Sequence, residues 1–187
     1  QAVVSLTKGI EAKTFSFMSD IIREVLPEVP YGVLSGPNLA KEIIAGQPAG
    51  TVIASQSELV RYAVQQALHS ALFRVFSSDD VHGVELGGAV KNVIALAVGI
   101  AMGLDYGDNA KAALITRGNA ELARLGVAMG CKAETFAGLS GMGDLIVTCT
   151  SMHSRNRRAG ILIGKGYTMD EAMKEVKMTV EGVYSAK

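Results

Sequence analysis

The chain has 187 residues, with 18 basic and 18 acidic side chains and an apolar fraction of 49%. The balanced charge argues against nucleic acid or an anionic membrane as partner, and the charged fraction of 19% is too low for a disordered chain. Cys131 and Cys149 form neither a disulfide framework nor a metal-ligand spacing, and the three histidines show no ligand spacing either. We therefore expect a globular, cytoplasmic protein without a metal site.

The first eighty residues alternate between strand and helix patterns. β-Branched and apolar runs predict strands at 2–6, up to Ser35, at 50–55 and at 72–78, with helices at about 14–26, after the Gly36-Pro37 turn, and at 57–70. This alternation is typical of an α/β sheet with parallel strands. No Gly-x-Gly-x-x-Gly follows any of these strands, so this half can at most complete a nucleotide-binding sheet.

Two positions in this half are candidate anion contacts. Lys8 follows the first predicted strand, at the sheet edge where open α/β folds bind ligands, although loop lysines are more often simply solvated. The free N–H groups near Asn38 and Ala40, where a helix is predicted to start, suit a phosphate or carboxylate. A plain connection between strand and helix would look the same.

From Val81 onward helix follows helix, and no further strand is expected. The first of these helices, ending near Gly103, carries Lys91 on a face whose other residues are apolar or very small. Burying an unpaired ammonium costs roughly several kcal/mol, so Lys91 must be paired, lie at a wet cleft, or have a lowered pKa. Each outcome suits a general acid or base, whereas a lysine reaching solvent from the helix edge is the structural alternative. A pair of glycines one turn earlier leaves room for a ligand or another backbone. No apolar run here is long enough to span a bilayer; the longest covers 93–102.

After a second long helix, capped by Asp108 or Asn109, the run 138–144 (GLSGMGD) predicts a tight loop that places Asp144 at a helix start. Asp144 lies one turn from Thr148 on the same helix face, and a simple capping role is the alternative for this carboxylate. The run 154–158 (SRNRR) puts cations at the start of the following helix, where they are electrostatically misplaced unless an anion sits among them. That pattern indicates phosphate, with a solvated basic turn as the alternative.

Five motifs in order, TKGIE, SGPNLA, GAVKNVIALA, GLSGMGDLIVTCTS and SRNRR, resemble the bacterial type of the NAD(P)-dependent glycerol-3-phosphate dehydrogenase family. The resemblance covers nearly the whole chain. It implies a Rossmann-type remnant over residues 1–79 and an all-helical substrate domain over 80–187. Gln1 is not an initiator methionine and the chain opens on a strand, so we expect a fragment that lacks the dinucleotide fingerprint and some C-terminal residues. Such a fragment should be inactive.

The resemblance also implies roles for particular residues. Lys91 matches the catalytic acid/base, Lys8 the second active-site lysine, and Asp144 a catalytic carboxylate near the substrate hydroxyls. The implied substrate contacts are Lys8, Gly36, Asn38, Lys91, Asp144, Thr148, Ser154, Arg155 and Asn156. The implied contacts with NAD or NADP are Lys8, Ala40, Arg155, Thr179 and Glu181. Relatives often have a hydroxyl residue where Asn38 stands, which leaves its contact open.

The implied function is interconversion of sn-glycerol 3-phosphate and dihydroxyacetone phosphate, as a step in phospholipid biosynthesis. A dehydrogenase of similar plan acting on another hydroxy acid is one alternative, and a non-enzymatic helical interaction module is another. The choice between NAD and NADP stays open, because the discriminating residue follows a strand absent from this chain. The oligomeric state is also open, with a homodimer among the options.

Overall fold

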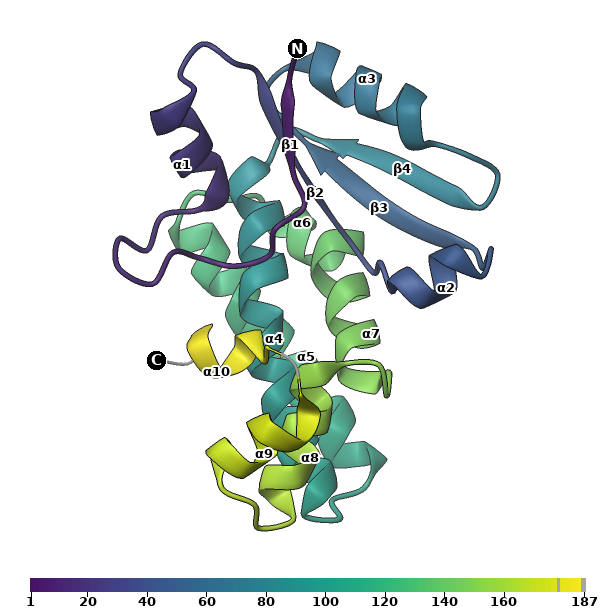
Figure 1. Ribbon diagram of the computed structural model, residues 1–187, viewed down its shortest axis with the longest axis vertical. Helices are drawn as coiled ribbons and strands as arrows, with labels where there is room; N and C mark the ends of the chain where they lie inside the picture. The colour runs from purple at the N-terminus through teal and green to yellow at the C-terminus, as the bar shows by residue number, and fades with distance from the viewer. Residues whose placement is uncertain (178, 186–187) are drawn as a thin grey trace.

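A sheet occupies one end of the molecule and a group of helices the other, as Figure 1 shows. The computed structural model describes residues 1–177 and 179–185. The strands are β1 (Val3–Ser5), β2 (Tyr31–Ser35), β3 (Ala49–Ala54) and β4 (Phe73–Ser78). The helices among them are α1 (Met18–Val25), α2 (Ala40–Ile44) and α3 (Glu58–Leu68). Within residues 79–177 and 179–185 every regular element is helical, so the expected fold class, a Rossmann-type sheet followed by helices, is confirmed. The domain boundary at residue 79 or 80 stays a prediction.

The sheet has the order β1-β2-β3-β4 and is mixed. β1 pairs with β2, and β3 with β4, in parallel, but β2 and β3 are antiparallel, with Val33 opposite Ala54. The expectation of a wholly parallel sheet was therefore wrong at this pair. α2 spans five residues, which at about 1.5 Å per residue is too short to carry the chain back along the sheet for a parallel crossover.

The two faces of the sheet are covered by different helices. Val33, Val52 and Ala54 point to one face and pack against Val81 and Val84, at the start of the long helix α4 (Val81–Gly103). α1 contacts β2, and α3 contacts β2, β3 and β4. Ile53, which alternates with Val52 and Ala54, lies near Val60 of α3. The sheet is thus attached directly to the helix that carries Lys91.

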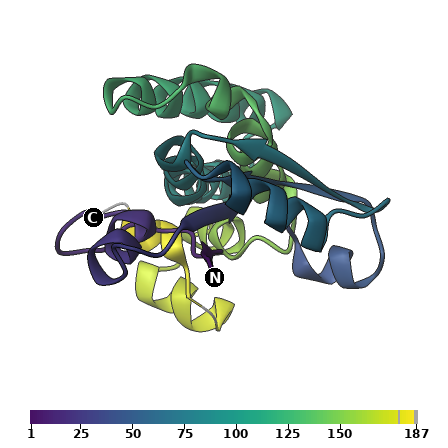
Figure 2. The ribbon, with the colours of Figure 1, turned by 90° about the horizontal axis from the view of Figure 1, so that it is seen from above.

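α4 is also the centre of the helical half. It contacts α5 (Asp108–Ala128), α7 (Asp144–Thr150), α8 (Arg155–Gly164) and α10 (Glu181–Ser185). In the view from above, α4 lies between α5 on one side and α8 with α9 (Met169–Val176) on the other (Figure 2). α4 and α8 approach closely because glycines face each other: a Cβ on Gly99 would lie 2.4 Å from the Arg157 carbonyl oxygen.

The uninterrupted apolar run 93–102 is too short to span a bilayer, but the whole of α4 is long and apolar enough to do so, with a mean hydropathy of 1.6 over its best window. Of that window, 67% is buried inside the protein. Mostly buried helices of this kind are found in the cores of soluble proteins.

Both cysteines are buried as well, and burial raises the pKa of Cys149 to about 12. They are therefore inert core residues, as the sequence indicated.

Three local expectations need correction. α1 begins at Met18 rather than near Thr14, because the chain between Ile10 and Phe17 folds back on itself through a β-bridge. α5 is preceded by Gly107, and Asp108 lies inside its first turn, paired with Lys111 at 2.5 Å. The glycine-rich run before Asp144 is not a loop: after α6 (Ala133–Ala137) it forms a π-helical turn, η1 (Leu139–Gly143), that leads into α7.

α4 buries a second charged residue that the sequence analysis did not single out. Glu85 is 4% exposed, and one of its oxygens accepts a hydrogen bond from the Ser19 backbone N–H at 2.9 Å. Its other oxygen accepts from the Ser19 hydroxyl. Burial raises the pKa of Glu85, partly offset by these hydrogen bonds. Glu85 thus joins the start of α1 to α4.

Candidate active site

A cavity of about 260 Å³ lies where the loops after β1 and β2 meet helices α4, α7 and α8. It lies beyond the C-terminal ends of two parallel strands, the edge at which α/β folds bind ligands. Its lining is polar and charged except for two side chains. The lining residues are Lys8, Asn38, Leu39, Lys91, Asn92, Asp144, Val147, Thr148, His153, Ser154, Arg155, Asn156 and Glu181.

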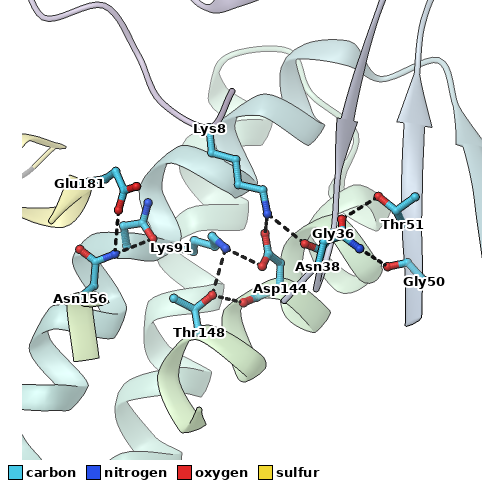
Figure 3. Close-up of polar contacts among 11 residues, drawn as sticks. Lys8, Gly36, Asn38, Gly50, Thr51, Lys91, Asp144, Thr148, Asn156 and Glu181 are labelled. Atoms are coloured by element: carbon cyan, nitrogen blue, oxygen red, sulfur yellow. Dashed lines mark hydrogen bonds and ion pairs between the residues drawn. The ribbon is translucent and has the colours of Figure 1, made fainter. Parts of the chain in front are cut away.

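Asp144 joins the two lysines that line this cavity (Figure 3). Its Oδ2 lies 2.6 Å from Lys8 Nζ and its Oδ1 lies 2.5 Å from Lys91 Nζ. Asp144 is 2% exposed and is the first residue of α7, yet the structure records no capping hydrogen bond from its side chain. The capping alternative is therefore replaced by a buried carboxylate shared between two ammonium groups. Lys8 also donates to the Gly36 carbonyl oxygen at 2.9 Å.

Lys91 meets all three conditions that its apolar helix face implied. It is 5% exposed, it is paired with Asp144, and it borders the cavity. Its Nζ donates to Thr148 Oγ1 at 3.0 Å, and that hydroxyl donates in turn to the Asp144 carbonyl oxygen at 2.5 Å. Burial and the nearby Lys8 charge lower the pKa of Lys91 to about 8, against the opposing effect of Asp144. The sign of this pKa shift depends on how close Lys8 and Asp144 lie to Lys91, so it follows from the structure and not from the sequence.

The paired glycines of α4 make this arrangement sterically feasible. A Cβ on Gly87 would lie 2.8 Å from the Ser140 carbonyl oxygen, and one on Gly88 would lie 3.3 Å from Lys8 Cγ. The space predicted for a ligand or another backbone is therefore taken by η1 and by the stem of Lys8. Larger residues here would push both elements away from Lys91.

Asn38 lines the cavity, but its amide is bound to a neighbouring strand. Asn38 Nδ2 donates to the Gly50 carbonyl oxygen at 3.1 Å, and its Oδ1 accepts from Thr51 Oγ1 at 2.9 Å (Figure 3). These bonds tie the loop after β2 to β3. Ala40 is exposed at the start of α2 and lies outside the cavity lining, as does the exposed Thr179; their predicted cofactor contacts stay predictions.

Three residues of the SRNRR motif, Ser154, Arg155 and Asn156, also line the cavity. Ser154 caps α8 by accepting from the Arg157 backbone N–H at 3.2 Å. Arg155 Nη2 lies 2.6 Å from Glu181 Oε1, so the anion beside this helix start is a carboxylate of the chain itself. Asn156 is 3% exposed, and its Oδ1 accepts from the Gly182 backbone N–H at 2.7 Å. Nine of the twelve predicted residues, all except Gly36, Ala40 and Thr179, therefore line one cavity. The Gly36 carbonyl oxygen accepts a hydrogen bond from Lys8, which is one of the lining residues.

Two polar cavity residues escaped the sequence analysis. Asn92 is 5% exposed and accepts from Asn156 Nδ2 through its Oδ1 at 3.0 Å, which joins α4 to α8 beside Lys91. A second polar residue next to the lysine in an apolar helix was the available signal. His153 lines the cavity from the loop before α8, and nothing in its sequence context distinguished it.

Comparisons with known proteins identify the family to which this chain is similar. Residues 80–187 match the family model for the NAD-dependent glycerol-3-phosphate dehydrogenase C-terminus, and residues 1–60 match the model for the N-terminus. The glycerol-3-phosphate dehydrogenase [NAD(P)+] of Acinetobacter baylyi is 67% identical over 98% of this chain and 51% of its own length. The corresponding protein of Psychrobacter cryohalolentis is 58% identical over 98% of this chain and 42% of its own.

Solved structures give the same result. A glycerol-3-phosphate dehydrogenase from Coxiella burnetii superposes with a TM-score of 0.95 at 42% identity, over 99% of this chain and 57% of its own. A glycerol-3-phosphate dehydrogenase from Saccharomyces cerevisiae superposes with a TM-score of 0.90 at 30% identity, over 100% of this chain and 57% of its own. The fold thus belongs to the class of proteins in which a Rossmann-type sheet is followed by helices, with a polar cavity between them. More specifically, the chain belongs to the NAD-dependent glycerol-3-phosphate dehydrogenase family. It spans about half the length of the curated relatives that it matches.

Proposed function

We propose that this chain provides the substrate-binding and acid/base part of an enzyme that interconverts sn-glycerol 3-phosphate and dihydroxyacetone phosphate. The observation that carries this proposal is one cavity lined by both a buried lysine of lowered pKa, Lys91, and an arginine, Arg155. A three-carbon phosphate ester needs both: a group that exchanges a proton with its oxygen, and a cation for its phosphate. Membership of the family supports the same substrate pair.

In the proposed reaction Lys91 handles the proton on the reacting oxygen. A pKa of about 8 means that neutral and charged Lys91 both exist near neutral pH. Neutral Nζ accepts the hydroxyl proton of glycerol 3-phosphate, and charged Nζ returns it to the oxygen of dihydroxyacetone phosphate. Asp144 and Thr148 hold Nζ in place at 2.5 Å and 3.0 Å, and Lys8 adds positive charge where negative charge develops on the carbonyl oxygen.

The residues present fit one end of NAD or NADP. A cavity of about 260 Å³ is small for a whole dinucleotide, and this chain has no glycine-rich phosphate loop after a strand. Lys8, Arg155 and Glu181 border the cavity and would hold the nicotinamide end. When bound, the cofactor supplies or accepts the hydride. We propose a cytoplasmic location and a role in phospholipid biosynthesis; a homodimer stays a prediction.

A substrate panel tests the proposal. An enzyme of the relatives' length that contains these residues should oxidise glycerol 3-phosphate in preference to 6-phosphogluconate, a hydroxyacyl thioester and unphosphorylated glycerol. Arg155→Lys should raise KM for glycerol 3-phosphate, because lysine keeps the charge but loses the bidentate fork. Preference for the thioester would favour the alternative dehydrogenase. A purely interacting helical module is disfavoured, because nothing in such a role explains why a buried lysine and a partly buried lysine share one buried carboxylate.

A further inference from the structure

The ion pair between Arg155 and Glu181 places an internal carboxylate beside the arginine proposed to bind phosphate. Arg155 Nη2 and Glu181 Oε1 are 2.6 Å apart, and both side chains border the cavity. Glu181 Oε2 makes a second, long contact of 3.5 Å with Asn156 Nδ2. The Glu181 carboxylate thus contacts Arg155 and Asn156, two of the three residues of this motif that are predicted to bind the substrate.

The charge of the cavity indicates what this carboxylate does. When Lys91 is charged, which is its major form below its pKa of about 8, three cations (Lys8, Lys91 and Arg155) face two carboxylates (Asp144 and Glu181) and leave one net positive charge. A phosphate monoester carries nearly two negative charges at neutral pH. If the Glu181 carboxylate moved out of the cavity, the net charge of the cavity would rise to plus two. That charge would balance the two negative charges of the phosphate ester.

Glu181 can move without releasing its segment. Its side chain is 32% exposed and that of Arg155 is 34% exposed, and ion pairs at such positions contribute little stability. The segment is anchored by other contacts: Val180 is 1% exposed, Val183 is 7% exposed, and the Gly182 N–H donates to Asn156. Gly182 also lies against α4, because a Cβ there would be 2.5 Å from the Asn92 carbonyl oxygen.

We propose that Glu181 is a built-in competitor for the substrate phosphate at Arg155: it pairs with the guanidinium when the cavity lacks an anion and is displaced when a phosphate ester enters. This inference rests on the proposed function, in which Arg155 binds the phosphate. Glu181 therefore lowers the affinity for anions and favours ligands whose charge is high enough to displace it. A phosphate dianion meets that condition better than a carboxylate monoanion of similar size.

The test measures ligand affinity without cofactor, because Glu181 is also a predicted cofactor contact. Glycerol 3-phosphate and inorganic phosphate are titrated by NMR at pH 7.5 into the unaltered chain, Glu181→Gln, Arg155→Gln and the double variant. Glu175→Gln is the matched control, since it removes the same charge from an exposed position on α9. Thermal unfolding of each variant checks that it is folded.

Glu181→Gln should tighten both ligands by about two- to fivefold, the range of an exposed ion pair, whereas Glu175→Gln should leave the dissociation constants unchanged. Arg155→Gln should weaken both ligands, and the gain from Glu181→Gln should vanish in that background. Weaker or unchanged binding by Glu181→Gln, with Arg155→Gln still weakening it, would overturn the competitor role and leave the proposed function intact. Unchanged binding by Arg155→Gln would overturn both.

Discussion

The buried Lys91 should make the folded chain less stable at neutral pH than it would be with an apolar residue in this position. Burial and the charge of Lys8 lower its pKa from 10.5 to about 8, which corresponds to about 3 kcal/mol because each tenfold change is worth about 1.4 kcal/mol. Asp144 offsets part of this cost and is already included in the net shift. Lys91→Met fills a similar volume without charge and leaves Asp144 paired with Lys8 at 2.6 Å.

The sign of the pH dependence follows from proton binding. The unfolded chain holds the Lys91 proton up to about pH 10.5, whereas the folded chain releases it near pH 8. Between these values the unfolded state binds more protons, so the free energy of unfolding rises with pH. Below pH 8 both states are protonated, and the full penalty of about 3 kcal/mol applies.

The assay is urea unfolding of the chain, followed by circular dichroism at pH 7.5 and pH 10. Lys91→Met should be more stable than the unaltered chain at pH 7.5, by up to about 3 kcal/mol, and the difference should shrink at pH 10. Lys174→Met, at an exposed position on α9, is the control for a lost surface lysine. A constant difference between Lys91→Met and the unaltered chain across this range would refute the desolvation of Lys91.

The other predictions concern the enzyme of the relatives' length. Lys91→Ala should lower kcat by roughly 10²-fold or more, the usual scale for losing a general acid or base; if kcat survived there and was abolished by Lys8→Ala, the role would belong to Lys8. The Asp144 carboxylate raises the pKa of Lys91, so Asp144→Asn should lower that pKa further. The pH at which kcat for glycerol 3-phosphate oxidation rises should then move to a lower value, and a move to a higher value would contradict this prediction. Calorimetry should show that this chain binds NAD or NADP far more weakly than the longer enzyme, because it has no glycine-rich fingerprint; comparable dissociation constants would refute that.

The local sequence determined most elements because their patterns depend on near neighbours. Alternating and β-branched runs located all four strands to within one or two residues. Ser154 and Thr168 are of a residue type that commonly caps helices, and each accepts a backbone hydrogen bond at the start of its helix. Lys91 was identifiable because a lysine on a face of small and apolar residues conflicts with the cost of burying charge.

Long-range packing decided what the sequence left open. The antiparallel pairing of β2 and β3 depends on where a five-residue helix can return the chain, and no residue pattern records that path. In the sequence, the position of Asp144 at a helix start is also compatible with a simple cap. In the structure, Asp144 pairs with Lys8, 136 residues away in the chain. The close approach of η1 to α4 at Gly87 makes this pairing possible. The sign of the Lys91 shift and the partner of Arg155 depend on charges brought together in three dimensions. Electrostatic interaction depends on distance and solvent exposure, and only the tertiary structure determines these for residues far apart in the chain.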